Sequence, residues 1–209
     1  MSRRLVLASQ SPARLQLLRQ AGLDPEVAIS GVDETTVTAP RVAELVALLA
    51  SAKATAVAKQ EDDALVIGAD SLLEFRGRAL GKPADVQDAR ERWQRMGGRS
   101  GVLHTGQALF DVRDGQVVGR DVAVVSTTVH FATITPRELE AYLDTGEPLA
   151  VAGAFTLDGL GAPFIRRVDG DPAAVVGLSL TVLRSQLAKR DLAITDLWAT
   201  ARPADSLRS

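Results

Sequence analysis

The chain has 209 residues, of which 46% are hydrophobic, so it can bury a sizeable core as one domain. Its 24 basic and 26 acidic residues are interspersed and give a formal net charge of −2, which argues against binding to a nucleic-acid polymer. Cysteine is absent, which excludes disulfides and thiol catalysis, and no apolar run approaches the roughly 20 residues of a membrane-spanning helix. We therefore expect a cytoplasmic protein that binds no membrane.

The first predicted elements meet at "LASQSPAR" (7–14), which joins an apolar strand to a helix. Ser11 is a typical helix N-cap with proline behind it, and Gly22 is expected to end the helix. The free backbone N–H groups and the dipole at such a helix start can bind phosphate. An ordinary capped turn is the other interpretation, and the motif alone does not decide between them. The side chains that would add hydrogen-bond donors are Ser9, Ser11 and Arg14.

The next segment, residues 41–60, has apolar residues at helical spacing and predicts a long helix. Lys53 falls near the middle of its apolar stripe. An ammonium there must either extend to solvent or meet an anion, so packing and function are both open. Only four of the 24 basic residues are lysines, which is a mild sign that a compact ammonium is needed where one occurs. The stripe consists of Val42, Val46, Leu49 and Ala56.

The run "ALVIGADSLLEF" (64–75) predicts a buried strand that is interrupted at Gly68–Asp70. Asp70 would then lie at a strand end, where open α/β sheets place catalytic groups, although an aspartate that caps a turn is equally compatible. Glu34 is a second acidic candidate. Two carboxylates without clustered histidine or cysteine suit a hard cation such as Mg²⁺. The single His104 and His130 are expected to be ordinary sheet residues.

Two loops complete the candidate site. "LGKP" (80–83) presents Lys82 in the manner of a phosphate hook, but the P-loop pattern is absent. The glycine-rich segment 152–164 is either a lid, a wall for the substrate or a plain irregular loop.

The other predicted elements are a helix over 85–96, extended chain over 102–134 with a hairpin turn at 113–116, a capping box at 135–138 opening a helix to Asp144, a strand in "FIRRV" and a last helix in "SLTVLRSQLAKR". Helices and strands mix without strict alternation, which predicts a mixed α/β fold with helices outside a mixed sheet and a cleft between two lobes.

Taken in order, these pieces resemble the Maf family of septum-formation-inhibitor-like nucleotide pyrophosphatases, from Leu5 to about Leu187. The pieces are LASxSPxR, VDE, a lysine late in the next helix, GAD, GKP, AGAF and VDGDPAAVVGLSL. The resemblance implies the curved-sheet fold of inosine-triphosphate pyrophosphatases, in one two-lobed domain over residues 1–200 with a disordered tail at 201–209. It also implies cleavage of nucleoside triphosphates between the α- and β-phosphates, dependence on Mg²⁺ or Mn²⁺, and a homodimer.

The resemblance also assigns roles to individual residues. Asp70, Lys53 and Lys82 match catalytic positions, with Asp70 as proton acceptor or metal holder, and Glu34 joins Asp70 at the metal. Three positions depart from the family's substrate subgroups and leave the base open, although an ionised Asp158 can accept hydrogen bonds from guanine N1–H and N2–H₂ but not from a carbonyl. The expected substrate-binding residues are Ser9, Ser11, Ala13, Arg14, Ser71 and Asp158, of which Ala13, Ser71 and Asp158 are the departures.

The sequence is also compatible with two other classes of function. One is a nucleotide-binding regulator of cell-division arrest for which catalysis is not essential. The other is a nucleotidyl- or sugar-transferase that uses the strand carrying Asp70. An intact set of Asp70, Lys53 and Lys82 favours hydrolysis, because a protein that only binds has no need of a water-activating carboxylate.

Overall fold

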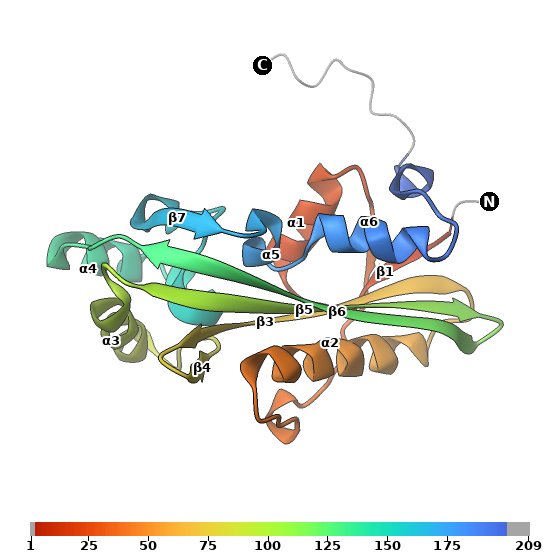
Figure 1. Ribbon diagram of the computed structural model, residues 1–209, viewed down its shortest axis with the longest axis horizontal. Coiled ribbons are helices and arrows are strands. Elements are labelled where there is room, and N and C mark those ends of the chain that lie inside the picture. Colours follow the sequence, from red (N-terminus) through yellow and green to blue (C-terminus); the bar gives the residue numbers. More distant parts are fainter. Residues whose placement is uncertain (1–2, 200–209) are drawn as a thin grey trace, which may run out of the picture.

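The computed structural model describes residues 3–199, so the expected disordered tail at 201–209 lies outside the described residues. A seven-stranded mixed sheet has the order β2-β1-β3-β5-β6-β7, with β4 paired to β3, and helices flank it, so the mixed α/β prediction is confirmed (Figure 1). No helix within residues 3–199 is long and apolar enough to cross a membrane. The strands are β1 (Leu5–Leu7), β2 (Glu26–Val27), β3 (Ala64–Phe75), β4 (Arg78–Leu80), β5 (Ser100–Arg113), β6 (Gln116–Phe131) and β7 (Ile165–Asp169). The helices are α1 (Pro12–Gln20), α2 (Val42–Ala58), α3 (Val86–Met96), α4 (Pro136–Asp144), α5 (Pro172–Val176) and α6 (Leu180–Ala188).

Local sequence signals account for most element ends. Ser11 caps α1 by accepting from the backbone N–H of Arg14, with proline at the first helical position, and Thr135 forms the predicted capping box of α4. The β5–β6 hairpin turns through Asp114 and Gly115, which have φ of 50° and 69°. Positive φ at both central residues fits the two-residue turn that matches the twist of paired strands. The predicted hairpin is therefore confirmed.

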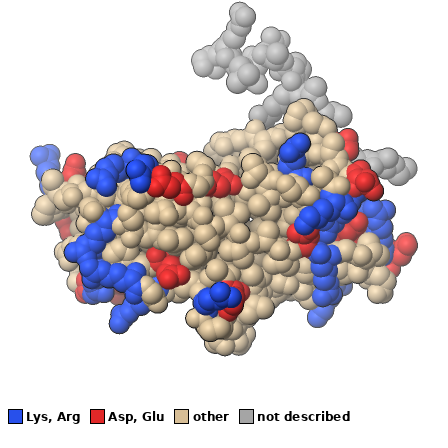
Figure 2. All heavy atoms as spheres, in the orientation of Figure 1, with Lys and Arg blue, Asp and Glu red and all other residues tan. Residues whose placement is uncertain are grey.

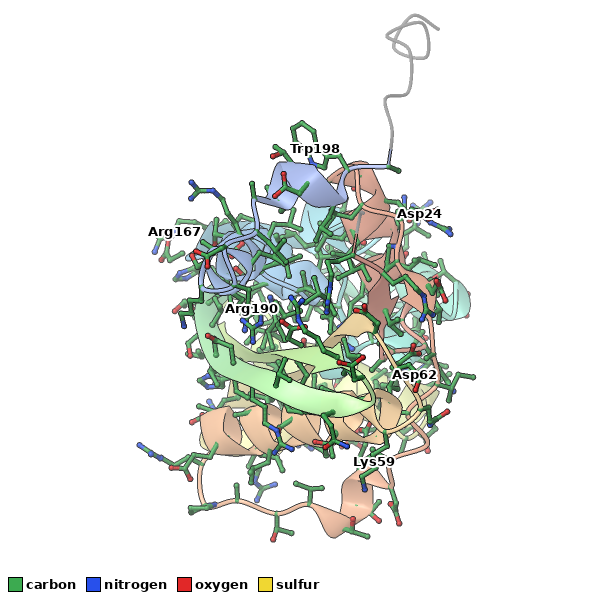
Figure 3. All side chains as sticks on the ribbon, turned by 90° about the vertical axis from the view of Figure 1, so that its right-hand side faces the viewer. Asp24, Lys59, Asp62, Arg167, Arg190 and Trp198 are labelled. Carbon is green, nitrogen blue, oxygen red and sulfur yellow. The ribbon has the colours of Figure 1, made fainter. Side chains whose placement is uncertain are left out.

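Helices cover the sheet in layers (Figures 1 and 3). Helix α2 packs on one face against β3 and β5, while α1, α5 and α6 lie on the other face. Helices α3 and α4 pack together near the end of the sheet where β7 lies. Three buried clusters result, one under α2, one under α1 and α6, and one around Trp93 beneath α3 and α4.

Strand β3 is one continuous strand of 12 residues, so the predicted interruption at Gly68–Asp70 is wrong. Gly68 allows α2 to approach rather than breaking the strand, because a Cβ there would lie 2.2 Å from the carbonyl oxygen of Ala50. Gly106 on β5 has the same role, with its Cβ position 2.1 Å from the carbonyl oxygen of Val46. The two glycines therefore allow α2 to pack closely against the sheet. Asp70 lies within the strand and not at its end.

The middle of β3 has a free edge. Strand β1 pairs with Leu65–Ile67, and β4 pairs with Leu73–Phe75. Between these segments, Gly68–Leu72 has β5 on one side and, among residues 3–199, no strand on the other. This gap opens the sheet edge beside Asp70 to the cleft described next.

Candidate active site

A cleft of about 830 Å³ lies at the free edge of β3. Its walls come from the start of α1, the segment between β2 and α2, the turn after β4 and the glycine-rich loop after α4. The structure brings all the predicted site residues to this one cleft. They are Ser9, Ser11, Ala13, Arg14, Glu34, Lys53, Asp70, Ser71, Lys82 and Asp158.

Lys53 binds two carboxylates at once. Its Nζ lies 2.6 Å from Oδ1 of Asp70 and 2.6 Å from Oε1 of Glu34. The side chains of Lys53 and Asp70 are each 10% exposed, whereas that of Glu34 is 55% exposed. Because Gly68 lets the backbone of α2 at Ala50 and Ala54 touch β3, the ammonium reaches Asp70 directly. The apolar stripe of α2 thus contains a lysine that is paired rather than extended into solvent.

Burial raises the pKa of Asp70, even though Lys53 and, more weakly, Arg14 favour its ionised form. The nearby negative charge of Glu34 adds to the rise. A carboxyl group whose pKa is shifted toward neutrality is better suited to accept a proton than an ordinary surface aspartate. Asp70 is therefore a candidate for the proton acceptor.

Arg14 joins three parts of the chain inside the cleft wall. It donates from Nη1 to Ser9 Oγ at 3.1 Å, from Nη2 to Ser71 Oγ at 3.1 Å and from Nε to the carbonyl oxygen of Gly177 at 2.8 Å. Burial lowers its pKa, but a guanidinium stays charged in proteins. The result is a fixed positive charge at the start of α1.

The hydroxyl proton of Ser71 is used in a hydrogen bond within the protein. Thr105 donates to the carbonyl oxygen of Ala174 at 2.8 Å and lies 2.9 Å from Ser71 Oγ. Since the single proton of Thr105 is used in that bond, Ser71 donates to Thr105 and accepts from Arg14. Sequence patterns did not single out Thr105, because a threonine is common in strands and the partners of Thr105 lie far away in the chain.

Lys82, Asp158 and Ala13 complete the predicted set along the cleft wall. Lys82 is exposed and, within residues 3–199, makes no hydrogen bond or ion pair, so its ammonium is available to a ligand in the cleft. Asp158 is exposed at the cleft wall, and Ala13 is half-buried in the first turn of α1.

Glu147, which also lines the cleft, was missed by the sequence analysis. Its carboxylate accepts hydrogen bonds from Tyr142, Thr156 and the backbone of the glycine-rich loop. No spacing signal could have found it, because its partners are 5 to 14 positions away, one on α4 and the others in the glycine-rich loop.

The two histidines lie away from these groups, in strands as predicted. His104 contacts Ser126 and Glu74, and His130 contacts Ser100 and Asp169. Across the described part of the chain, no three histidine or acidic side chains gather as metal ligands. Two carboxylates, those of Glu34 and Asp70, do converge on one cation position, that of the Lys53 ammonium.

Comparison with known proteins identifies the family. A family model described as "Maf-like protein" matches residues 4–190. A Streptomyces coelicolor protein named "Nucleoside triphosphate pyrophosphatase" is 57% identical and covers 95% of this chain and 96% of its own length. Proteins of the same name from Salinispora tropica and Mycobacterium sp. (strain JLS) are 56% and 49% identical, over 94% and 95% of this chain and 88% and 99% of their own lengths. The chain belongs to the Maf-like protein family.

Proposed function

We propose that this chain is a nucleoside triphosphate pyrophosphatase, which hydrolyses its substrate to a nucleoside monophosphate and pyrophosphate. The relatives' shared name supports the reaction class. The observation that carries the proposal is the buried Lys53–Asp70 pair at the free edge of β3, in a cleft that also holds Arg14 and the exposed Lys82.

The charges of the cleft suit a triphosphate. Arg14, Lys53 and Lys82 provide three cationic groups, and the start of α1 adds the positive end of a helix dipole. Fixed positive charge around a leaving pyrophosphate stabilises the negative charge that develops on it. Glu34 is the exposed partner of the Lys53 ammonium, so phosphate oxygens of a substrate could take its place there.

The chemical step is a single displacement by water. The water oxygen forms a bond to the α-phosphorus, the bond from that phosphorus to the bridging oxygen breaks, and the electron pair leaves on pyrophosphate. Asp70 accepts the proton of the water, which its raised pKa favours. Arg14 and Lys82, which also line the cleft, supply positive charge for the phosphate oxygens.

A divalent cation, Mg²⁺ or Mn²⁺, fits the donor set. Mg²⁺ is usually bound by one or two carboxylates together with substrate phosphates, and Glu34 and Asp70 already converge on one cation position. Such an ion would neutralise phosphate charge and lower the pKa of bound water. Glu34 and Asp70 are the residues that would hold it, and with the ion present Asp70 would orient the attacking water instead of accepting its proton.

The base would contact the wall formed by Ala13, Ser71 and Asp158. Because the hydroxyl proton of Ser71 is donated to Thr105, Ser71 can only accept from a ligand. The exposed carboxylate of Asp158 also accepts, so this wall favours bases that offer N–H groups, such as guanine, over the carbonyl-rich edges of uracil and thymine.

Two alternatives find less support. A transferase would need a metal-binding D-x-D pair, and Asp169 and Asp171 form such a pair in the sequence. Asp171 instead caps α5, Asp169 pairs with Arg167, and neither lines the cleft. A division regulator without catalysis would not require the buried pair of Asp70 and Lys53.

We also propose that the reaction takes place in the cytoplasm.

We further propose a homodimer that forms through β6. Strand β7 pairs only with Thr128–Phe131, so the outer edge of β6 from Gln116 to Thr127 has no strand partner within residues 3–199. Exposed valines follow this edge, and the face that carries it has charged side chains mainly toward its two ends (Figure 2). This edge is rich in valine and lacks proline, although it also carries Arg120 and Asp121. A long strand edge of this kind calls for cover, and a second copy of the same edge can supply it about a two-fold axis. The valines are Val118, Val122 and Val124.

A substrate panel tests the enzymatic proposal. Purified protein is incubated with nucleoside triphosphates and Mg²⁺ or Mn²⁺, and the products are identified. We expect monophosphate and pyrophosphate, no reaction with diphosphates, and loss of activity with a chelator. Diphosphate and inorganic phosphate as the first products would overturn the proposal.

A further inference from the structure

The glycine-rich loop after α4 is folded around one carboxylate, that of Glu147. Oε1 accepts from the hydroxyl of Tyr142 at 3.1 Å, from the hydroxyl of Thr156 and from the backbone N–H of Gly161 at 3.0 Å. Oε2 accepts from the backbone N–H of Leu160 at 3.0 Å. Four donors from two sides of the loop therefore meet at one side chain.

The sequence of the loop is adapted to this contact. A Cβ at Gly159 would lie 2.5 Å from Oε2 of Glu147, and a Cβ at Gly161 would lie 2.4 Å from the hydroxyl oxygen of Tyr142. Both glycines lack positive φ, so they are needed here for close approach and not for an unusual backbone conformation. The hydroxyl of Thr156 adds a second bond to the N–H of Gly161 at 3.0 Å.

The residues that this contact fixes form part of the cleft. Leu157, Asp158 and Gly159 lie between the anchored positions and line the cleft, together with Glu147 itself. The phosphate-binding candidates come from other elements, namely α1, α2, β3 and the turn after β4. A change in the loop would therefore alter the wall of the cleft without touching Lys53 or Asp70.

We infer that Glu147 is a positioning residue for substrate selection: its carboxylate holds the segment Thr156–Gly161 so that Leu157 and Asp158 present a fixed wall to the nucleotide. This inference rests on the proposed function. Hydrogen bonding by these donors lowers the pKa of Glu147 despite partial burial, so it is ionised in neutral solution. An ionised carboxylate is the acceptor that four donors require, because it offers acceptor sites only.

The test compares Glu147→Gln with a matched control, Glu140→Gln. The amide keeps the shape of the side chain but turns one acceptor oxygen into a donor that faces a donor of the loop. Glu140 is a half-exposed carboxylate on α4, paired with Arg90. We measure kcat and KM for several nucleoside triphosphates and the melting temperature of each protein.

We expect Glu147→Gln to affect some nucleotides more than others. Glu147→Gln should raise KM about tenfold for the preferred nucleotide, change kcat less than about threefold, and reduce the ratio of kcat/KM between preferred and poor nucleotides. Glu140→Gln should leave all of these unchanged. Should Glu147→Gln fail to fold, Thr156→Val removes one of the same bonds and should change the ratio in the same direction.

An unchanged ratio in folded Glu147→Gln, with all nucleotides affected equally, would overturn the inference and leave the proposed function intact. Failure of the proposed function looks different, because the unaltered protein would then hydrolyse no triphosphate and bind none with a preference. That second outcome overturns both.

Discussion

In the proposed function, the pair of Lys53 and Asp70 serves both folding and chemistry. Each is costly to bury alone, because an unpaired charge in the interior loses its hydration. Together, at 2.6 Å, they satisfy each other, and the exposed Glu34 shares the ammonium. The pair leaves a carboxyl group of raised pKa beside a cation that can bind phosphate, which is the combination that hydrolysis of an anhydride needs.

Replacement of Asp70 by asparagine should remove the proton acceptor while keeping the shape of the side chain. We expect kcat to fall by about 10²–10⁴ with little change in KM. In the unaltered enzyme, kcat/KM should rise with pH through the raised pKa of Asp70, since only the ionised carboxylate accepts a proton. Steady-state rates from acidic to neutral pH check both statements, and a variant that keeps most of its turnover would remove Asp70 from this role.

The variant Lys53→Met tests whether Lys53 is needed for the packing of α2 or for activity. The thioether fills the space of the lysine stem on α2, so the protein should fold, but the buried Asp70 loses its counter-ion and the phosphates lose a cation. We expect a rate at least about 100-fold lower. Lys59→Met, at the exposed end of the same helix, is the control and should behave like the unaltered enzyme. Rate measurements beside thermal melts decide the matter, and near-normal rates for Lys53→Met would contradict the phosphate assignment.

Asp158 should influence which base is accepted. Asp158→Gln replaces an acceptor-only group by one that can also donate to a carbonyl, so the preference should shift toward UTP and dTTP by up to about a hundredfold. The measurement is kcat/KM for GTP, UTP and dTTP with both proteins. A preference for UTP that is already present and survives the substitution would show that Asp158 does not contact the base.

The elements around the site are positioned by small residues as much as by large ones. Helix α2 can bring Lys53 to β3 only because Gly68 and Gly106 leave room for its backbone. The same glycines lie in strands, where glycine otherwise weakens a sheet. The close helix–sheet contact thus accounts for both positions.

Gly106→Ala should displace α2. Its Cβ would lie 2.1 Å from a backbone oxygen of the helix, so we expect a loss of about 1–3 kcal/mol in the free energy of unfolding. Gly119→Ala on β6 is the control, because its nearest neighbour would be at an ordinary 3.5 Å. Urea unfolding of the two variants makes the comparison, and equal stabilities would mean that the contact with α2 can relax at no cost.

At the scale of the whole molecule, the two edges of the sheet differ. The β2 edge is a strand of only two residues, whereas the β6 edge runs unpaired from Gln116 to Thr127 among the described residues (Figure 1). Short edges resist association, and long apolar edges favour it. This asymmetry supports β6 as the surface that a second copy would cover.

Val122→Lys should therefore weaken the dimer, because it places a charge within the edge of β6, where Val122 is 44% exposed. Val27→Lys is the matched control, since Val27 is 48% exposed on the opposite edge strand. Light scattering after size-exclusion chromatography should give a dimer for the unaltered protein and Val27→Lys, and a monomer for Val122→Lys. A monomeric unaltered protein, or a Val122→Lys dimer, would contradict the proposal.

The sequence by itself determined the helix caps, the β5–β6 turn and the mixed α/β class, because each depends on residues that are neighbours in the chain. It also indicated the residues of the cleft, through motifs whose order matches a known family. Only the tertiary structure decided that β3 continues through Gly68–Asp70, since the reason for that glycine is a helix nearly 20 positions earlier in the chain. The contacts of Ser71 with Thr105 and of Glu147 with the loop likewise join positions that no local pattern connects, so their roles follow from packing alone.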